Sequence, residues 1–158
     1  MRLILCAFLF VLLGCGSTIQ SSKNLKNEEI VFSTISKDKL FGNGIEGITE
    51  EKFTITNEKQ WQVFLNKINS VNNVSLSFTE TNINFSNYII ICVFDAIRNT
   101  GGYAIEIKRV FVEKNNLNIV YTKKGPGPME MVTTAITQPY HIVKIEKRVE
   151  NHKFINKN

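Results

Sequence analysis

A run of seven consecutive apolar residues, Tyr88–Phe94, constrains the fold of this chain more than any other stretch. Most of these residues are β-branched or aromatic, which is typical of a β-strand. Because the side chains of a strand alternate between its two faces, both faces of this strand are apolar. The run therefore predicts a strand that is buried on both faces, with a helix or a second sheet against it.

Residues 57–69 carry the clearest helical pattern. The apolar side chains recur at spacings of three and four and predict one buried stripe, made of Trp61, Phe64, Leu65 and Ile68. Asn57 can cap the helix, and Gln60 completes a capping-box pattern three residues later. We expect this helix to end near Asn69 and to pack against the sheet.

Two alternating stretches, residues 103–112 and 117–122, predict a β-hairpin. The alternation slips at Arg109, which a β-bulge or a strong twist would explain. Asn115 and Asn116 suit the turn, because Asn tolerates a positive φ.

The remaining extended stretches are less regular. Residues 29–35 predict a first strand, and residues 132–137 and 140–145 predict two final extended pieces bent at Gln138-Pro139, with Pro139 at an edge or a kink. Residues 148–158 are polar and are expected to fray.

Residues 41–47 contain the spacing G-x-G-x-x-G, but residues 48–56 then alternate like a strand. A dinucleotide site needs a helix there, so this segment is interpreted as a glycine-rich loop. Together the patterns predict an α+β fold with a mainly antiparallel sheet of five to seven strands and one packed helix. A small sandwich with the helix closing one end is the alternative.

The first residues are interpreted as a targeting signal. Arg2 precedes an unbroken apolar run over residues 3–13, which is too short to span a bilayer but suits a signal peptide. The sequence Leu12-Leu13-Gly14-Cys15 resembles the bacterial lipobox. The resemblance implies that the Cys15 thiol receives a diacylglycerol, that cleavage occurs before Cys15, and that the new amino group is acylated with a fatty acid such as palmitate.

Four segments follow from this interpretation: a signal peptide over residues 1–14, a flexible tether over 15–28, a folded domain over 29–147 and a polar tail over 148–158. Several acyl chains anchor a protein stably to a membrane. We expect a cell-envelope location, with the outer membrane favoured because Gly16 is not acidic.

The charge pattern argues against a nucleic-acid partner. The formal charge is +5, and much of the excess lies from Lys144 onward, so the domain before it is nearly neutral. Nucleic-acid binding needs a basic patch on a folded face.

No catalytic constellation emerges, so we expect a protein that is not an enzyme and that has no cofactor and no metal. Cys92, inside the apolar run, is interpreted as a buried hydrophobic residue. His141 is interpreted as a surface or partly packed residue, and His152 lies in the tail. Asp95 with Arg98 is interpreted as a loop ion pair of little energetic weight.

Three local signatures occur in a fixed order: Thr100-Gly101-Gly102-Tyr103, Gly125-Pro126-Gly127-Pro128 and Thr137-Gln138-Pro139-Tyr140-His141. In this order and spacing they resemble the C-terminal domain of the PrcB family, which is named for a non-catalytic subunit of a secreted bacterial protease complex. The resemblance covers residues 85–147, and residues 54–68 more loosely. It implies an accessory protein that binds and stabilises a protease.

The loops are therefore the expected working surface. Turns that the fold requires would account for them, but stiff Gly-Pro loops also suit protein contacts, because they lose little freedom on binding. The candidate contact residues are Gly101, Gly102, Tyr103, Gly125, Pro126, Gly127, Pro128 and Tyr140. Two alternatives remain open: a protease-inhibitor-like module that inserts residues 123–131 into a cleft, and an envelope binder of small molecules or glycans.

Overall fold

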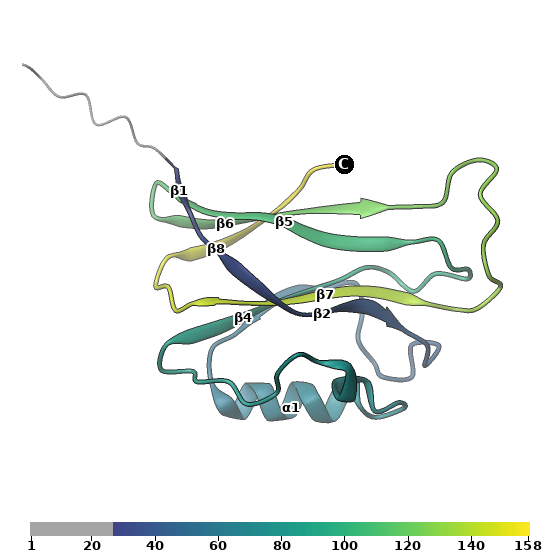
Figure 1. Ribbon diagram of the computed structural model, residues 1–158, viewed down its shortest axis with the longest axis horizontal. Coiled ribbons are helices and arrows are strands. Elements are labelled where there is room, and N and C mark those ends of the chain that lie inside the picture. The colour runs from purple at the N-terminus through teal and green to yellow at the C-terminus, as the bar shows by residue number, and fades with distance from the viewer. Residues whose placement is uncertain (1–26) are drawn as a thin grey trace, which may run out of the picture.

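The computed structural model describes residues 27–158, so Cys15 and the predicted signal and tether before residue 27 lie outside the described residues. Two four-stranded sheets stack on each other, and helix α1 covers the outer face of one of them (Figure 1). The elements are β1 Glu28–Glu29, β2 Phe32–Leu40, β3 Lys52–Ile55, α1 Glu58–Ile68, the 3-10 helix η1 Val74–Ser77, β4 Tyr88–Phe94, β5 Ala104–Glu113, β6 Asn116–Lys124, β7 Gln138–Glu146 and β8 Asn151–Asn156.

The first sheet has the order β1-β5-β6-β8 and the second β2-β7-β4-β3. Every strand pair is antiparallel except β6 with β8. The predicted α+β class is confirmed, with eight strands rather than five to seven. The helix covers a face of the sandwich and does not close an end.

Strand β4 lies inside the second sheet, between β7 and β3, and is buried on both faces as predicted. Ile89, Ile91 and Val93 pack into the core between the two sheets. The intervening residues, which include Phe94 and the buried Cys92, pack into the core beneath α1. The two apolar faces of β4 therefore belong to two separate cores, and the sheet that holds β4 is the middle layer.

Helix α1 follows its sequence pattern closely. Trp61, Phe64 and Ile68 are buried, and the Asn57 side chain accepts a hydrogen bond from the Gln60 amide at 3.0 Å. The Gln60 side chain accepts from the backbone N–H of Thr56, 2.9 Å away, rather than from that of Asn57. The cap is thus a capping box shifted by one residue, which ties the helix to the end of β3.

The predicted hairpin is formed by β5 and β6, and the pairing shifts between Ile107 and Arg109, which confirms the bulge. The turn is one residue earlier than predicted. Lys114 and Asn115 have positive φ angles of 48° and 64°, which a tight two-residue hairpin turn requires.

Two predictions about the last third of the chain are wrong. Residues 132–136 form no strand, and β7 is one continuous strand from Gln138 onward. Pro139 lies in this interior strand, not at an edge. It is tolerated as the second residue of β7, where few ladder bonds are lost, and its carbonyl accepts the backbone N–H of Asp95 at 2.9 Å.

The expected fraying of residues 148–158 is also wrong, because residues 151–156 form β8, which pairs in parallel with β6. Phe154 packs against the core between the sheets, and His152 Nδ1 lies 3.0 Å from the Thr54 hydroxyl. The alternation of His152 and Phe154 with polar residues is a weak strand signal. Residues 151–156 form a strand because β6 presents an open edge with which they can pair.

His141 connects the two sheets and is buried, contrary to the expectation of a surface or partly packed residue. It lies on β7, yet the backbone N–H of Ile107 on β5 donates to its Nδ1 at 2.9 Å. Nδ1 therefore carries no proton, and Nε2 donates to the Thr34 hydroxyl at 3.0 Å. Burial, followed by the nearby charge of Lys37, lowers the pKa of His141 from 6.5 to about 4.

This linkage makes the stability of the domain pH-dependent. Because the folded pKa is lowered, the contribution of His141 is complete above pH 6.5 and is lost as the pH falls towards about 4, where the unfolded chain binds an extra proton. Chemical denaturation between pH 7.5 and 4 should show a loss on the order of 3 kcal/mol. His141→Gln should abolish most of this slope. His152→Gln should remove only a minor part of it, because burial lowers the pKa of His152 in the same direction but by less. An unchanged slope in His141→Gln would contradict the assignment.

Candidate functional site

Three connections lie at one end of the sandwich, which we call the loop end: residues 41–51, 95–103 and 125–137 (right-hand side of Figure 1). Residue 27 lies at the opposite end, beside the β5–β6 turn and the β7–β8 connection, which we call the N-terminal end. The sequence signatures at residues 100–103 and 125–128 lie at the loop end. The third signature begins there, at the start of β7.

The first signature contacts the third directly, and it also contacts the connection that carries the second. Gly101 donates its backbone N–H to the carbonyl of Thr133 at 2.9 Å. Thr137 exchanges backbone hydrogen bonds with Arg98, and its hydroxyl donates to the carbonyl of Thr100 at 2.9 Å. These bonds fasten the β6–β7 connection to the β4–β5 connection at three points.

Close packing explains two of the glycines. Gly102 has a φ of +81°, and a Cβ atom there would lie 2.7 Å from Val132 and 3.0 Å from Pro126. A Cβ atom on Gly125 would lie 3.2 Å from the Tyr103 ring, which in turn stacks on the Arg98 guanidinium 4.6 Å away. The Gly-Gly and Gly-Pro signatures are therefore two halves of one packed contact.

Asp95 anchors the Arg98 side chain of this contact. The Asp95–Arg98 ion pair, which was expected to have little energetic weight, is largely buried. The Asp95 carboxylate is only 1% exposed, accepts a bidentate pair of bonds from Arg98, and lies 2.7 Å from the ammonium of Lys123. Burial alone would raise the pKa of Asp95, but the hydrogen bonds from Lys123 and Arg98 outweigh it, so the pKa lies below its ordinary value. Asp95 thus ties the end of β4 to the end of β6.

The predicted contact residues differ in exposure. Gly125, Gly127 and Pro128 are exposed, Gly102, Tyr103 and Pro126 are half-buried, and Gly101 is buried. Tyr140 is also buried, and its proposed contact role is wrong. Its ring stacks on Phe94 in the core beneath α1, with the ring centroids 5.6 Å apart, and its hydroxyl lies 3.0 Å from that of Ser36. Tyr140 faces the core because β7 is an interior strand of the middle sheet.

The most exposed apolar side chains of this end are two methionines that the sequence patterns did not single out as contact residues. Met129 is 97% exposed and Met131 is 99% exposed, at the tip of the β6–β7 connection. The sequence signal was the alternation Met-Glu-Met directly after two Gly-Pro pairs. The loop is fastened to the β4–β5 connection before the tip, at Gly125 and Pro126, and after it, at Thr133. The tip between these points is therefore held away from the core.

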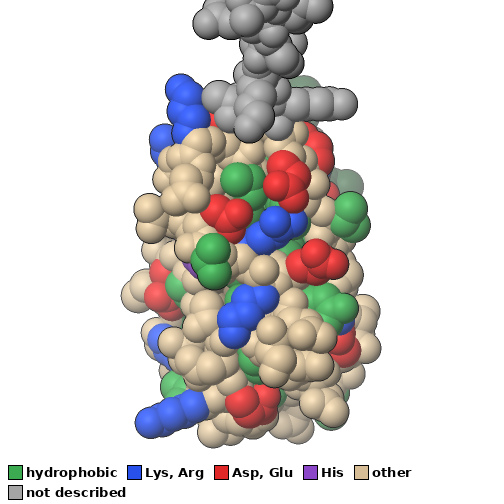
Figure 2. Space-filling model, turned by 90° about the vertical axis from the view of Figure 1, so that its left-hand side faces the viewer, with side chains coloured by type: hydrophobic (Ala, Val, Ile, Leu, Met, Phe, Trp, Pro, Cys, Tyr) green, Lys and Arg blue, Asp and Glu red, His purple; other side chains and the backbone are tan. Residues whose placement is uncertain are grey.

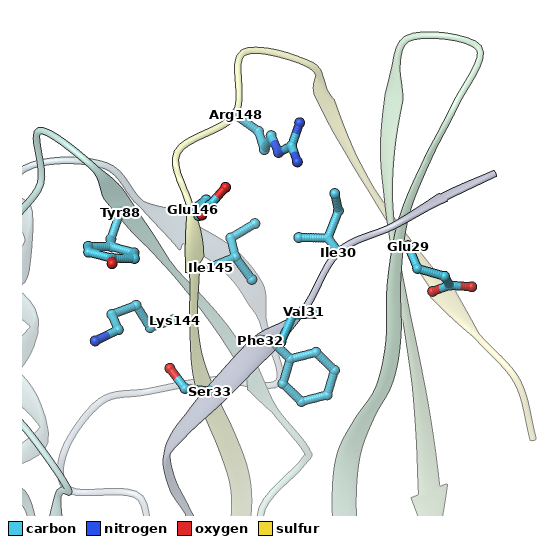
Figure 3. Close-up of a pocket in the computed structure, with 10 residues that line it drawn as sticks. All are labelled: Glu29, Ile30, Val31, Phe32, Ser33, Tyr88, Lys144, Ile145, Glu146 and Arg148. Atoms are coloured by element: carbon cyan, nitrogen blue, oxygen red, sulfur yellow. The ribbon is translucent and has the colours of Figure 1, made fainter. Parts of the chain in front are cut away.

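A second candidate is a groove of about 350 Å³ at the N-terminal end, where the chain passes from β1 in one sheet to β2 in the other (Figure 3). Ile30 and Ile145 face each other across it. Its charged groups are largely engaged. Arg148 pairs with Glu28 at 2.8 Å, and Lys144 pairs with Glu80 and lies over the Tyr88 ring. Few charged side chains of the groove are therefore free to contact a bound molecule.

The surface of this end is mixed in charge. Figure 2 shows positive and negative side chains interspersed with apolar ones across the N-terminal end. Of the two carboxylates that line the groove, that of Glu29 pairs with Arg109 across β1 and β5. These pairs hold the first strand on the sheet and leave no single-sign field.

The other polar side chains among the described residues do not gather into a further site. Within residues 27–158, no group of three or more His, Cys, Asp or Glu side chains is placed to hold a metal ion. Glu46 is buried beside Gly42, and neither of its carboxylate oxygens has a hydrogen-bond partner among the described residues. No helix within this range is long and apolar enough to cross a membrane.

The described part of the chain is thus an α+β sandwich whose signature residues build one fastened loop end. Residues 89–146 match the family described as PrcB C-terminal, which confirms the predicted resemblance over that stretch. The match runs from β4 to the end of β7 and includes the loop-end connections at 95–103 and 125–137. No curated protein and no solved structure matches the chain.

The packing of Gly102 gives a direct test of the loop end. Gly102→Ala should lower the free energy of unfolding by about 2 kcal/mol, because it forces a Cβ atom into a left-handed backbone and against Val132. Gly127→Ala is the matched control: a Cβ atom there meets nothing closer than 3.8 Å, and stability should change by less than about 0.5 kcal/mol. Equal effects in urea unfolding would refute the packing role of Gly102.

Proposed function

We propose that this protein is a non-catalytic, lipid-anchored envelope protein whose loop end binds another protein, in the manner of an accessory subunit of a protease complex. One observation carries the proposal: the match to the PrcB C-terminal family spans β4–β7 and the connections at 95–103 and 125–137. In that stretch the glycines and prolines are used to fasten a surface loop, which has no role in either core.

The proposed anchor is Cys15 of the lipobox-like sequence, with the outer membrane favoured. The position of residue 27 supports this arrangement, because it lies at the end of the sandwich opposite the loop end (Figure 1). A chain tethered there would present the loop end away from the lipid.

An inhibitor-like module is the alternative. It is favoured by the exposed β6–β7 connection, where a backbone hydrogen bond from Glu130 to the Gly127 carbonyl closes a turn. The two functions differ in their effect on a protease partner. An inhibitor slows cleavage of a peptide substrate, whereas a stabilising subunit prolongs the lifetime of the protease without lowering its initial rate.

The anchor is tested by Cys15→Ser in the full chain. The wild-type protein should fractionate with membranes and incorporate labelled palmitate, and the variant should do neither, because the thiol that receives the diacylglycerol is gone. Cys6→Ser, in the apolar leader, is the control and should behave as wild type. A Cys15→Ser protein that still sediments with membranes would refute the lipoprotein assignment.

Protein binding is tested by affinity capture of the full-length, membrane-anchored protein after mild solubilisation. We expect one envelope protein to be recovered in near-stoichiometric amount at low and at moderate salt. The Gly102→Ala variant, whose loop end is distorted, should recover less. Failure of the wild-type protein to recover any envelope protein at either salt concentration would end the accessory-subunit proposal.

A further inference from the structure

The tip of the β6–β7 connection is a closed turn. Glu130 donates its backbone N–H to the carbonyl of Gly127 at 3.1 Å, and the Glu130 carboxylate accepts the backbone N–H of Gly127 at 2.9 Å. Pro128 lies inside this turn and restricts its backbone further. With Gly101 bound to Thr133 behind the turn, the tip is held at its centre and at its base.

Two long apolar side chains project from this fixed turn. Met129 and Met131 are 97% and 99% exposed, so they contribute almost nothing to folding. The chain has three methionines, and the third is Met1. Beyond the predicted signal peptide, methionine therefore occurs only at this tip. Exposed apolar side chains on a preordered loop lose little entropy on binding, and Met adapts to irregular pockets.

The composition of the connection indicates what kind of surface it fits. Residues 125–137 contain one charged residue, Glu130, and no Lys, Arg or aromatic residue. Segments that bind anionic membranes or nucleic acid use basic and aromatic side chains, which this tip lacks. An apolar hollow on a protein is the complementary surface.

We propose that residues 127–131 are the principal partner contact, and that Met129 and Met131 enter an apolar pocket on a partner protein. This inference rests on the proposed protein-binding function and specifies the element that performs it. The tip contributes two adjacent anchors from one turn, so the pocket on the partner needs to accommodate two unbranched side chains and exclude water from both.

Photo-crosslinking tests the contact directly. Cells that express the tagged full chain are grown with photo-methionine, which beyond the signal peptide enters only positions 129 and 131. Irradiation should yield one defined adduct with an envelope protein. In the control variant Met129→Leu/Met131→Leu/Val149→Met, the probe moves to the N-terminal end, where Val149 is 98% exposed, and this adduct should disappear. An adduct of equal yield from position 149, or adducts only with lipid, would overturn the proposal.

Affinity capture then measures the contribution of the two side chains. Met129→Ala/Met131→Ala should reduce recovery of the crosslinked protein at least tenfold and leave thermal unfolding unchanged. Leu76→Ala, which truncates an 83% exposed side chain on η1, should alter neither. If the wild-type protein captures its partner and the double variant captures as much, the contact assignment fails while the proposed function stands. If the wild-type protein captures nothing, the proposed function itself fails.

Mild peroxide provides an independent readout, because the thiol of Cys92 is buried and the two methionines are exposed. Oxidation to the polar sulfoxide should weaken capture by the wild-type protein at least tenfold. Met129→Leu/Met131→Leu retains apolar side chains and should capture the partner before and after peroxide. Equal peroxide sensitivity in the Leu variant would place the sensitive group elsewhere and contradict the proposal.

Discussion

The burial of β4 on both faces is the constraint on which the rest of the structure depends. A strand with one apolar face needs one covering layer, but β4 has two, so its sheet must be the middle of three layers. Helix α1 covers one face and the β1-β5-β6-β8 sheet covers the other. β7 lies between β4 and β2 in this sheet and is also covered on both faces, so its polar residues must find partners inside the protein.

His141 and Asp95 show how those polar groups are satisfied. The His141 ring lies between the sheets and accepts the Ile107 amide, so a side chain from the middle sheet completes the hydrogen bonding of the outer sheet at its bulge. Asp95 pairs with Arg98 and Lys123 where β4 and β6 end. Both residues stabilise the interior, and neither is free to take part in catalysis.

The elements encoded by local patterns were predictable from the sequence. The two-faced strand, the capped helix, the bulged hairpin and the burial of Cys92 all follow from side-chain periodicity or composition within a dozen residues. The predictions that were wrong concern properties that depend on the neighbouring strands in the sheet. β8 exists because β6 offers an open edge, and Tyr140 is buried because β7 is interior. The candidate loops were identified, but Met129 and Met131 were not, because exposure cannot be read from a short Met-Glu-Met sequence.

The pairing of β8 with β6 has a consequence for how the chain folds. Within residues 27–158, every sheet contact except that of the β5–β6 hairpin joins residues that are far apart in sequence. Native contacts of long range slow folding, because loop-closure entropy is lost before burial compensates for it. The outer sheet acquires its last strand only when residues 151–156 have emerged. Until then β6 has an unpaired edge that could pair with another chain, so the domain depends on residues 151–156 to avoid self-association.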